Sequence, residues 1–150
     1  MVPVLRTEKL TKCFGDLVAN RQIDIEIYPG EIHAIAGENG AGKSTLMKTL
    51  YGVYEATSGE IYVDGERMEQ WSPMLAREKG VGMVFQDFRL VPAFTVLENV
   101  FISLRRAGWK IDRKQLRRRI IEKSEEYSLS VNPDVEVWKL DLGQRQHIKI

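Results

Sequence analysis

The chain has 150 residues, enough for one domain with its own hydrophobic core. Its 22 lysines and arginines nearly balance its 21 aspartates and glutamates, so the overall charge gives no reason to expect a nucleic acid or an acidic partner. The only cysteine, Cys13, excludes an intrachain disulfide, and no apolar run approaches the roughly 18–20 residues that cross a bilayer. We therefore expect a reducing, intracellular setting without direct membrane insertion.

The first part of the chain predicts an antiparallel β-layer. Residues Val4–Phe14 carry β-compatible side chains and end at a turn, Gly15-Asp16. The segment Ile23–Ile27 alternates strictly between apolar and acidic residues and is closed by Pro29-Gly30. Phe14 lies at the loop end of the first strand, where an aromatic ring belongs either to the core or to a platform on which a nucleotide base stacks.

A glycine-rich stretch follows that fits the pattern G-x-x-x-x-G-K-[ST] in full. Its residues are Gly37, Glu38, Asn39, Gly40, Ala41, Gly42, Lys43, Ser44 and Thr45. The apolar run Ile32–Ala36 before it predicts a buried strand, and Thr45–Leu50 predicts a helix. A strand-to-helix turn is the context that phosphate binding by this pattern needs.

Each type of position in this loop has a chemical reason. The glycines allow positive φ angles and close approach of the backbone, so that successive N–H groups point at one anion, and the helix N-terminus adds further donors. Lys43 supplies a mobile positive charge for the β- and γ-phosphates, and the Ser44 hydroxyl is placed to hold Mg²⁺. Thr45 is expected to add a hydrogen bond to the α-phosphate. The stretch predicts binding of a nucleoside triphosphate with Mg²⁺.

The middle of the chain predicts short elements. Ser58–Gly65 is typical of a strand that ends in an Asp-Gly turn. Ser72-Pro73 predicts the start of a short helix that stops at Gly80. Val81–Phe85 then predicts a buried strand, with Gln86 at its carboxyl end, where ligands bind in open α/β sheets. Gln86 either reaches a metal or water there or serves as a hydrogen-bonding loop residue.

From residue 95 the pattern is helical. Thr95–Glu98 matches a capping box, and a second helix is predicted to start at Asp112, with Gln115 three residues later. A run of basic residues accompanies these helices: Arg105, Arg106, Lys110, Arg113, Lys114, Arg117, Arg118 and Arg119. Such a run forms either a solvated helix face or a surface for a partner or lipid headgroups. The segment Leu140–Gln146 leads into a final helix.

Together, the phosphate loop, Gln86 and the last segment resemble the nucleotide-binding domain of an ABC transporter, from Val4 to the last residue. Within this family the sequence is most similar to the ATP-binding subunits of importers for simple sugars and nucleosides. The similarity lies in four segments, Gly37–Lys48, Gly82–Gln86, Leu90–Pro92 and Thr95–Val100. The resemblance implies an α/β fold, a P-loop NTPase core with an N-terminal antiparallel β-layer and a partial α-helical subdomain, truncated before the catalytic Asp-Glu strand. The β-layer and core would occupy about residues 1–90 and the helical subdomain about 91–150.

The resemblance also implies roles for single residues. Phe14 would stack on adenine, and Gln86 would contact Mg²⁺ or the attacking water, which gives Gln86 and Lys43 catalytic roles and makes Ser44 and Gln86 the metal-binding residues. The family's signature, Leu-Ser-Gly-Gly-Gln or Leu-Ser-aliphatic-Gly, binds the ATP of a second domain across a head-to-tail dimer. The corresponding residues here are Leu140, Asp141, Leu142, Gly143 and Gln144.

The aspartate in this signature changes its chemistry. Asp141 can cap the final helix, with Gln144 completing a capping box. A carboxylate that faces a phosphate repels it, unlike the family's serine. We hypothesise that this signature forms the weaker of two unequal composite sites.

The resemblance implies an energy-coupling ATPase, cytoplasmic and peripheral on the inner face of the plasma membrane, with transmembrane permease subunits as partners. The family's general base and switch histidine do not occur after the signature, so we expect this chain to bind ATP but to hydrolyse it poorly. The alternative is a soluble ABC-type ATPase acting on nucleic acid or ribosomes through the basic run, and nucleic acid is the less favoured partner. A P-loop kinase or GTPase would give the predicted β-layer no role.

Overall fold

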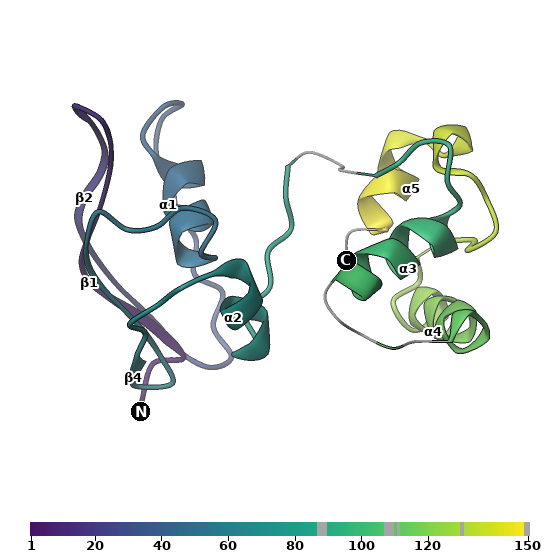
Figure 1. Cartoon of the computed structure of the whole chain (residues 1–150), viewed down its shortest axis with the longest axis horizontal. Helices are drawn as coiled ribbons and strands as arrows, with labels where there is room; N and C mark the ends of the chain where they lie inside the picture. The colour runs from purple at the N-terminus through teal and green to yellow at the C-terminus, as the bar shows by residue number, and fades with distance from the viewer. Residues whose placement is uncertain (87–89, 107–109, 111, 130, 149–150) are drawn as a thin grey trace. The chain divides into compact units, whose positions relative to one another are not determined.

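The computed structural model describes residues 1–86, 90–106, 110, 112–129 and 131–148 (Figure 1). The chain divides into two compact units, Met1–Met83 and Val84–Ile150. The first unit combines a β-sheet with two helices, and the second is built mainly from helices.

The described part of the first unit contains one antiparallel sheet. Its strands lie in the order β2-β1-β3-β4. Their bounds are β1 (Leu5–Phe14), β2 (Leu17–Ile27), β3 (Ser58–Val63) and β4 (Glu66–Arg67). The predicted β-layer, the turn after Phe14 and the strand before Asp64-Gly65 are therefore confirmed.

Strand β1 departs from simple alternation through a β-bulge. Leu5 and Thr7 are buried, and strict alternation would next bury Lys9. Instead the register shifts between Thr7 and Leu10, and Lys9 takes a positive φ of 47°. Leu10 thereby faces the core with 1% of its surface exposed. The bulge keeps the lysine in solvent and the leucine inside.

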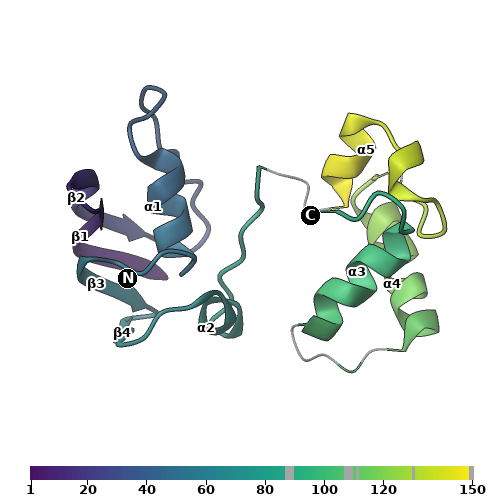
Figure 2. The same cartoon turned by 45° about the horizontal axis from the view of Figure 1, so that its top comes forward.

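Helix α1 (Lys43–Leu50) covers one face of this sheet (Figure 2). Its apolar side contributes Leu46 and Leu50 to a core that also contains Leu5, Leu10 and Ile61. The helix therefore packs its apolar stripe against the inward-facing residues of β1 and β3. This packing fixes where the start of α1, and the loop before it, lie relative to the sheet.

Helix α2 (Pro73–Glu78) has the ends that the sequence predicts. The Ser72 hydroxyl accepts a hydrogen bond from the Leu75 amide at 3.3 Å, and Pro73 occupies the first helical position. Gly80 follows the helix with a φ of 82°.

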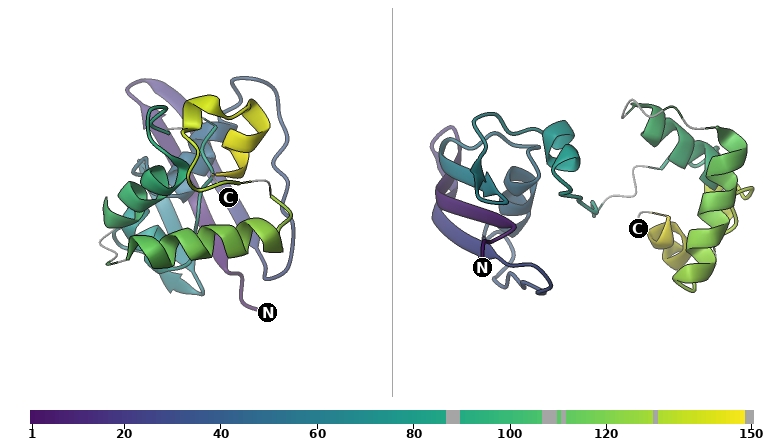
Figure 3. Two further views of the ribbon diagram at one scale, coloured as in Figure 1. Left: turned by 90° about the vertical axis from the view of Figure 1, so that its right-hand side faces the viewer. Right: turned by 90° about the horizontal axis from the view of Figure 1, so that it is seen from below.

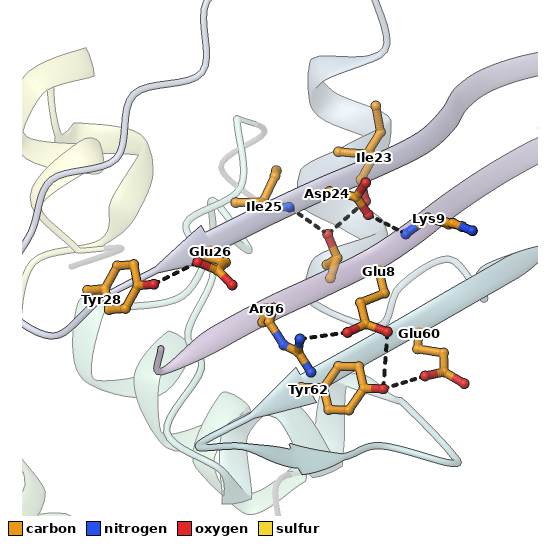
Figure 4. Close-up of polar contacts among 11 residues, drawn as sticks. Arg6, Glu8, Lys9, Ile23, Asp24, Ile25, Glu26, Tyr28, Glu60 and Tyr62 are labelled. Carbon is orange, nitrogen blue, oxygen red and sulfur yellow. Dashed lines mark hydrogen bonds and ion pairs between the residues drawn. The ribbon is translucent and has the colours of Figure 1, made fainter. Parts of the chain in front are cut away.

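The other face of the sheet carries a polar network (Figure 4). Arg6 pairs with Glu8 at 2.6 Å and lies over the ring of Tyr62, 4.2 Å from its centroid. The Tyr62 hydroxyl donates hydrogen bonds to Glu60 and Glu8. The hydrogen bond to Glu60 raises the pKa of Tyr62 above its ordinary value.

Two predicted buried strands are wrong. Residues 32–36 form no strand, and Ile32 is 99% exposed. Residues 81–85 form none either, and Val84 is 62% exposed. Within the described residues neither segment pairs with a strand, so its backbone lacks the ladder of hydrogen bonds that a strand requires. Only Ile35 and Val81 of the two segments pack partly against the core.

The second unit contains three helices and one 3₁₀ turn in its described part (Figure 3). They are α3 (Val96–Arg106), α4 (Arg113–Glu126), η1 (Val137–Lys139) and α5 (Leu142–His147). The capping box at Thr95 is confirmed, since the Glu98 amide donates to the Thr95 hydroxyl at 3.2 Å and the Thr95 amide donates to the Glu98 carboxylate at 2.9 Å. Asp112 caps α4 by accepting from the Gln115 amide at 3.1 Å. None of the helices described is long and apolar enough to span a membrane.

Candidate functional site

The glycine-rich loop leads directly into the N-terminus of α1. Gly40 and Gly42 have φ angles of 87° and 85°, in the left-handed region that favours glycine. Gly42 is the N-cap residue, no side chain caps the helix, and its first turn contains no acidic residue. The first N–H groups of α1 therefore keep their hydrogen-bonding capacity and partial positive charge for an external anion.

Strand β2 fixes the end of this loop. A Cβ atom at Gly42 would lie 2.3 Å from the backbone oxygen of Ala19, so only glycine fits there. The side-chain amide of Asn20 donates a hydrogen bond to the Gly42 carbonyl oxygen at 3.2 Å. Asn20 is only 8% exposed, and its Oδ1 has no hydrogen-bond partner in the described structure. Sequence reasoning missed Asn20, because a polar residue within a strand carries no pattern that points to a loop more than 20 residues away.

Lys43 folds back over the loop that precedes it. Its Nζ donates hydrogen bonds to the carbonyl oxygens of Gly37 and Glu38, both at 2.6 Å. The Ala41 amide donates a hydrogen bond to the Glu38 carbonyl oxygen at 3.2 Å, which closes a turn within the loop. The lysine charge is thus held next to the backbone groups that precede α1. Asn39, Ala41 and Ser44 are exposed, and Thr45 is half-buried.

Phe14 stands in an aromatic and cationic cluster at the end of β1. Its ring centroid lies 5.2 Å from that of Tyr54, with an interplanar angle of 84°. The ammonium group of Lys12 lies over the Phe14 ring at 4.9 Å, and that of Lys48 lies over the Tyr54 ring at 5.5 Å. Lys12 stands two residues before Phe14, but register shifts on both sides of Lys12 interrupt the period of two that could have signalled it. No sequence pattern points to Tyr54.

Gln86 and the signature residues belong to the second unit. Gln86 is exposed and lies in a bend rather than at the end of a strand. The Asp141 carboxylate accepts a hydrogen bond from the Gln144 amide at 2.8 Å, and the Gln144 side chain accepts one from the Asp141 amide at 3.1 Å. This reciprocal capping box of α5 confirms the predicted helix start. Gly143 follows within the first turn, where a Cβ atom would come 3.3 Å from the Asp141 carboxylate.

Arg145 stabilises the backbone that leads into this signature. Its guanidinium donates to the carbonyl oxygens of Leu140 at 2.9 Å and Trp138 at 3.1 Å. These contacts and the capping box together fix the chain on both sides of Asp141.

Several of the basic residues described on α4 form ion pairs along an exposed face. Arg113 pairs with Glu98 at 3.4 Å, and Arg118 pairs with Glu122 at 3.9 Å. Arg117 holds Asp134 through two nitrogens, the closer at 2.5 Å. That contact lowers the pKa of Asp134 and raises that of Arg117. Much of the positive charge on this face is therefore compensated within the unit.

The pattern G-x-x-x-x-G-K-[ST] leading into a helix is the sequence signature of the P-loop class of nucleotide-binding proteins, although residues 32–36 before it form no strand here. Residues 20–150 match the ABC transporter family, and the chain belongs to that family. It is 45% identical over 148 residues to the nucleoside import ATP-binding protein NupA of Lactococcus lactis subsp. cremoris. It is 38% identical over 177 residues to the glucose import ATP-binding protein TsgD13 of Haloferax volcanii.

These matches cover 98% and 99% of this chain, but the chain spans only 29% and 32% of the two relatives. Solved structures show the same fold. A nucleotide-free ATP-binding cassette from an ABC transporter matches with a TM-score of 0.83 and 26% identity, over 99% of this chain and 63% of that one. A dimeric cassette in a post-hydrolysis state, bound to ADP and phosphate, matches with a TM-score of 0.79 and 27% identity, over 97% and 66% of the two chains.

Proposed function

We propose that this chain is a nucleotide-binding part of an ATP-binding subunit in an ABC importer for sugars or nucleosides. The observation that carries the proposal is the glycine-rich loop, closed on Lys43 and joined to the uncapped N-terminus of α1. The names of the relatives, which include nucleoside, glucose and ribose import proteins, support the transport role.

In this proposal the loop binds the phosphates of ATP. The residues that surround the phosphates are Gly37, Asn39, Gly40, Ala41, Gly42, Lys43, Ser44 and Thr45. The backbone N–H groups at the start of α1 donate hydrogen bonds to the phosphates. Lys43 exchanges its two carbonyl acceptors for phosphate oxygens, which as anions form stronger hydrogen bonds than neutral carbonyls.

The base and the metal ion use other groups. Phe14 offers an exposed ring on which adenine stacks. The Ser44 hydroxyl would hold Mg²⁺, a hard cation that prefers oxygen ligands. The metal ion would neutralise the charge that develops on the phosphates. In this scheme Lys43 and Gln86 are the catalytic residues on the chain.

The signature segment would serve a second copy of the domain. Asp141, Gly143 and Gln144 would face the γ-phosphate of ATP bound by the partner in a head-to-tail dimer. The dimeric cassette among the similar structures supports this mode of assembly. Because Asp141 is a carboxylate, we propose that this composite site is the weaker of two.

The remaining parts of the proposal concern turnover and partners. In this proposal the chain binds ATP, and its membership of the ABC transporter family supports a role in ATP hydrolysis. Transmembrane permease subunits would receive the closure of the domains, with the subunit peripheral on the cytoplasmic side of the membrane. The ion pairs along α4 give no support to the alternative of a nucleic-acid partner.

Titration calorimetry of Mg·ATP into the chain tests the proposal. Lys43→Ala should weaken binding roughly tenfold or more, because charge-assisted hydrogen bonds to the phosphates are lost. Lys114→Ala, an exposed lysine of α4, is the matched control and should bind as the parent does. Absence of binding to the parent chain, or equal binding by both variants, would contradict the proposal.

A further inference from the structure

The ring of Phe14 is held by neighbours that the phosphate-loop pattern does not include. Tyr54 meets it in the edge-to-face geometry that aromatic pairs prefer, with centroids 5.2 Å apart. Lys12 lies over the ring, and its ammonium group is itself fixed by a hydrogen bond to the Glu55 carbonyl at 2.8 Å. Despite these contacts Phe14 remains 42% exposed.

We infer that Tyr54 is a positioning residue for the base platform and that Lys12 restricts the base to one face of the Phe14 ring. This inference rests on the proposed function, in which Phe14 stacks on the base. A phenyl ring has two faces, and an ammonium group over one of them leaves the other for a flat ligand. A ring that is already oriented loses less freedom when the ligand binds, so the contact with Tyr54 raises affinity without touching the ligand.

Tyr54 also connects the platform to the phosphate-binding helix. The ammonium group of Lys48, a residue of α1, lies over the Tyr54 ring at 5.5 Å. Lys12 lies over the same ring at 5.9 Å. The tyrosine therefore packs between the end of β1, which carries Phe14, and the helix that begins at the phosphate loop. Base and phosphates would be bound by parts of one packed unit.

The inference separates base-dependent from phosphate-dependent binding. Stacking uses the π-face, which every base possesses, so loss of Tyr54 should weaken ATP and GTP to a similar extent. Inorganic tripolyphosphate has no base, so its binding to the loop should not change. Tripolyphosphate binding also reports whether a variant still has a folded loop.

The experiment compares affinities of Mg·ATP and Mg·tripolyphosphate for variants of the chain by titration calorimetry. Tyr54→Leu should weaken ATP about 3- to 10-fold, the range expected for the loss of an aromatic pair, and leave tripolyphosphate unchanged. Tyr54→Phe should restore ATP binding to within about twofold, because it keeps the ring. Lys12→Met should weaken ATP less than Tyr54→Leu, about 2- to 5-fold, because it removes the cation–π contact that helps to hold the Phe14 ring but leaves the Tyr54 contact in place.

Phe14→Ala provides the reference for the proposed function and should weaken ATP roughly 5- to 100-fold. In the Phe14→Ala background, Tyr54→Leu should have no further effect, because its influence passes through the ring. If Phe14→Ala weakens ATP but Tyr54→Leu does not, the inference fails while the proposed function stands. If Tyr54→Leu weakens ATP and tripolyphosphate equally, Tyr54 acts on the fold and the inference also fails. If Phe14→Ala leaves ATP binding unchanged, the base platform itself is refuted, and the inference fails with it.

Discussion

The side-chain amide of Asn20 donates a hydrogen bond to the carbonyl oxygen of Gly42, and this 3.2 Å contact joins β2 to the residue at which α1 begins. The strand approaches so closely that no side chain fits at Gly42. The position of the phosphate loop is therefore set by the sheet as well as by the loop's own glycines.

Gly42→Ala should destabilise the first unit more than Gly40→Ala. Both glycines have φ angles near 86°, but an added Cβ meets the Ala19 oxygen at 2.3 Å from Gly42 and nothing within 4 Å from Gly40. We expect a loss of about 2–4 kcal/mol for Gly42→Ala and about 1–2 kcal/mol for Gly40→Ala in urea unfolding. Equal losses would show that β2 does not constrain the loop.

Asn99 holds the start of the second unit together, and its loss should be costly. Its buried side chain accepts a hydrogen bond from the Val91 amide at 2.7 Å and donates to the carbonyl oxygens of Val91 and Thr95. Asn99→Leu keeps the volume but leaves these groups unpaired, at a cost of about 2–3 kcal/mol. Hydrogen exchange of the Val91 amide should accelerate accordingly. Ser103→Ala, which removes only one hydrogen bond to the Asn99 carbonyl, is the control and should leave that amide protected.

The stability of the second unit should fall in acid partly because of Glu98. Hydrogen bonds from the Thr95 amide and hydroxyl, and then the charge of Arg113, lower the pKa of Glu98 below its ordinary value. The unfolded chain therefore takes up this proton first as pH falls. The stability that Glu98 contributes is complete above its ordinary pKa and is lost as pH falls through the lowered one.

Glu98→Gln should accordingly flatten the decline of the unfolding free energy below about pH 5, since the amide does not titrate. The measurement is urea unfolding of both proteins between pH 7 and pH 3. An unchanged acid slope would mean that other carboxylates, such as Asp134 beside Arg117, account for the decline.

Asp141 should be replaceable by serine as a cap but not by alanine. Asp141→Ala removes the acceptor for the Gln144 amide and should cost about 1 kcal/mol of helix stability, whereas serine preserves most of it. In the full-length subunit, Asp141→Ser should raise ATP turnover, because the repulsion between the carboxylate and the phosphate is removed. Unchanged turnover would refute the weakened composite site.

Local signals predicted the fold best. The helix starts at Ser72, Thr95 and Asp112 were predictable because each cap bonds an amide only three residues away. The turn between β1 and β2 was predictable because Gly15-Asp16 is a local turn signal, and Gly15 takes a φ of 57°. The apolar run 32–36 shows the limit, because apolar periodicity reports that a segment can pair but not that a neighbouring strand is present.

The candidate site also combines residues that local sequence signals predict with residues that only long-range packing brings in. The phosphate loop has a contiguous pattern, so its residues could be named from the sequence. Asn20 and Tyr54 act on Gly42 and Phe14 from 22 and 40 residues away, as the numbering of each pair shows, and only packing brings them together. The bulge at Lys9 was equally hidden, because strict alternation would have placed the lysine inward.

The most direct test is hydrogen–deuterium exchange of the amides of residues 40–45 with and without Mg·ATP. The account predicts that ATP slows exchange in this segment, because the N–H groups at the start of α1 donate to the phosphates. Slowed exchange that disappears in Lys43→Ala would support the central claim. Exchange unchanged by ATP at concentrations that saturate binding would show that the nucleotide is held elsewhere and would contradict it.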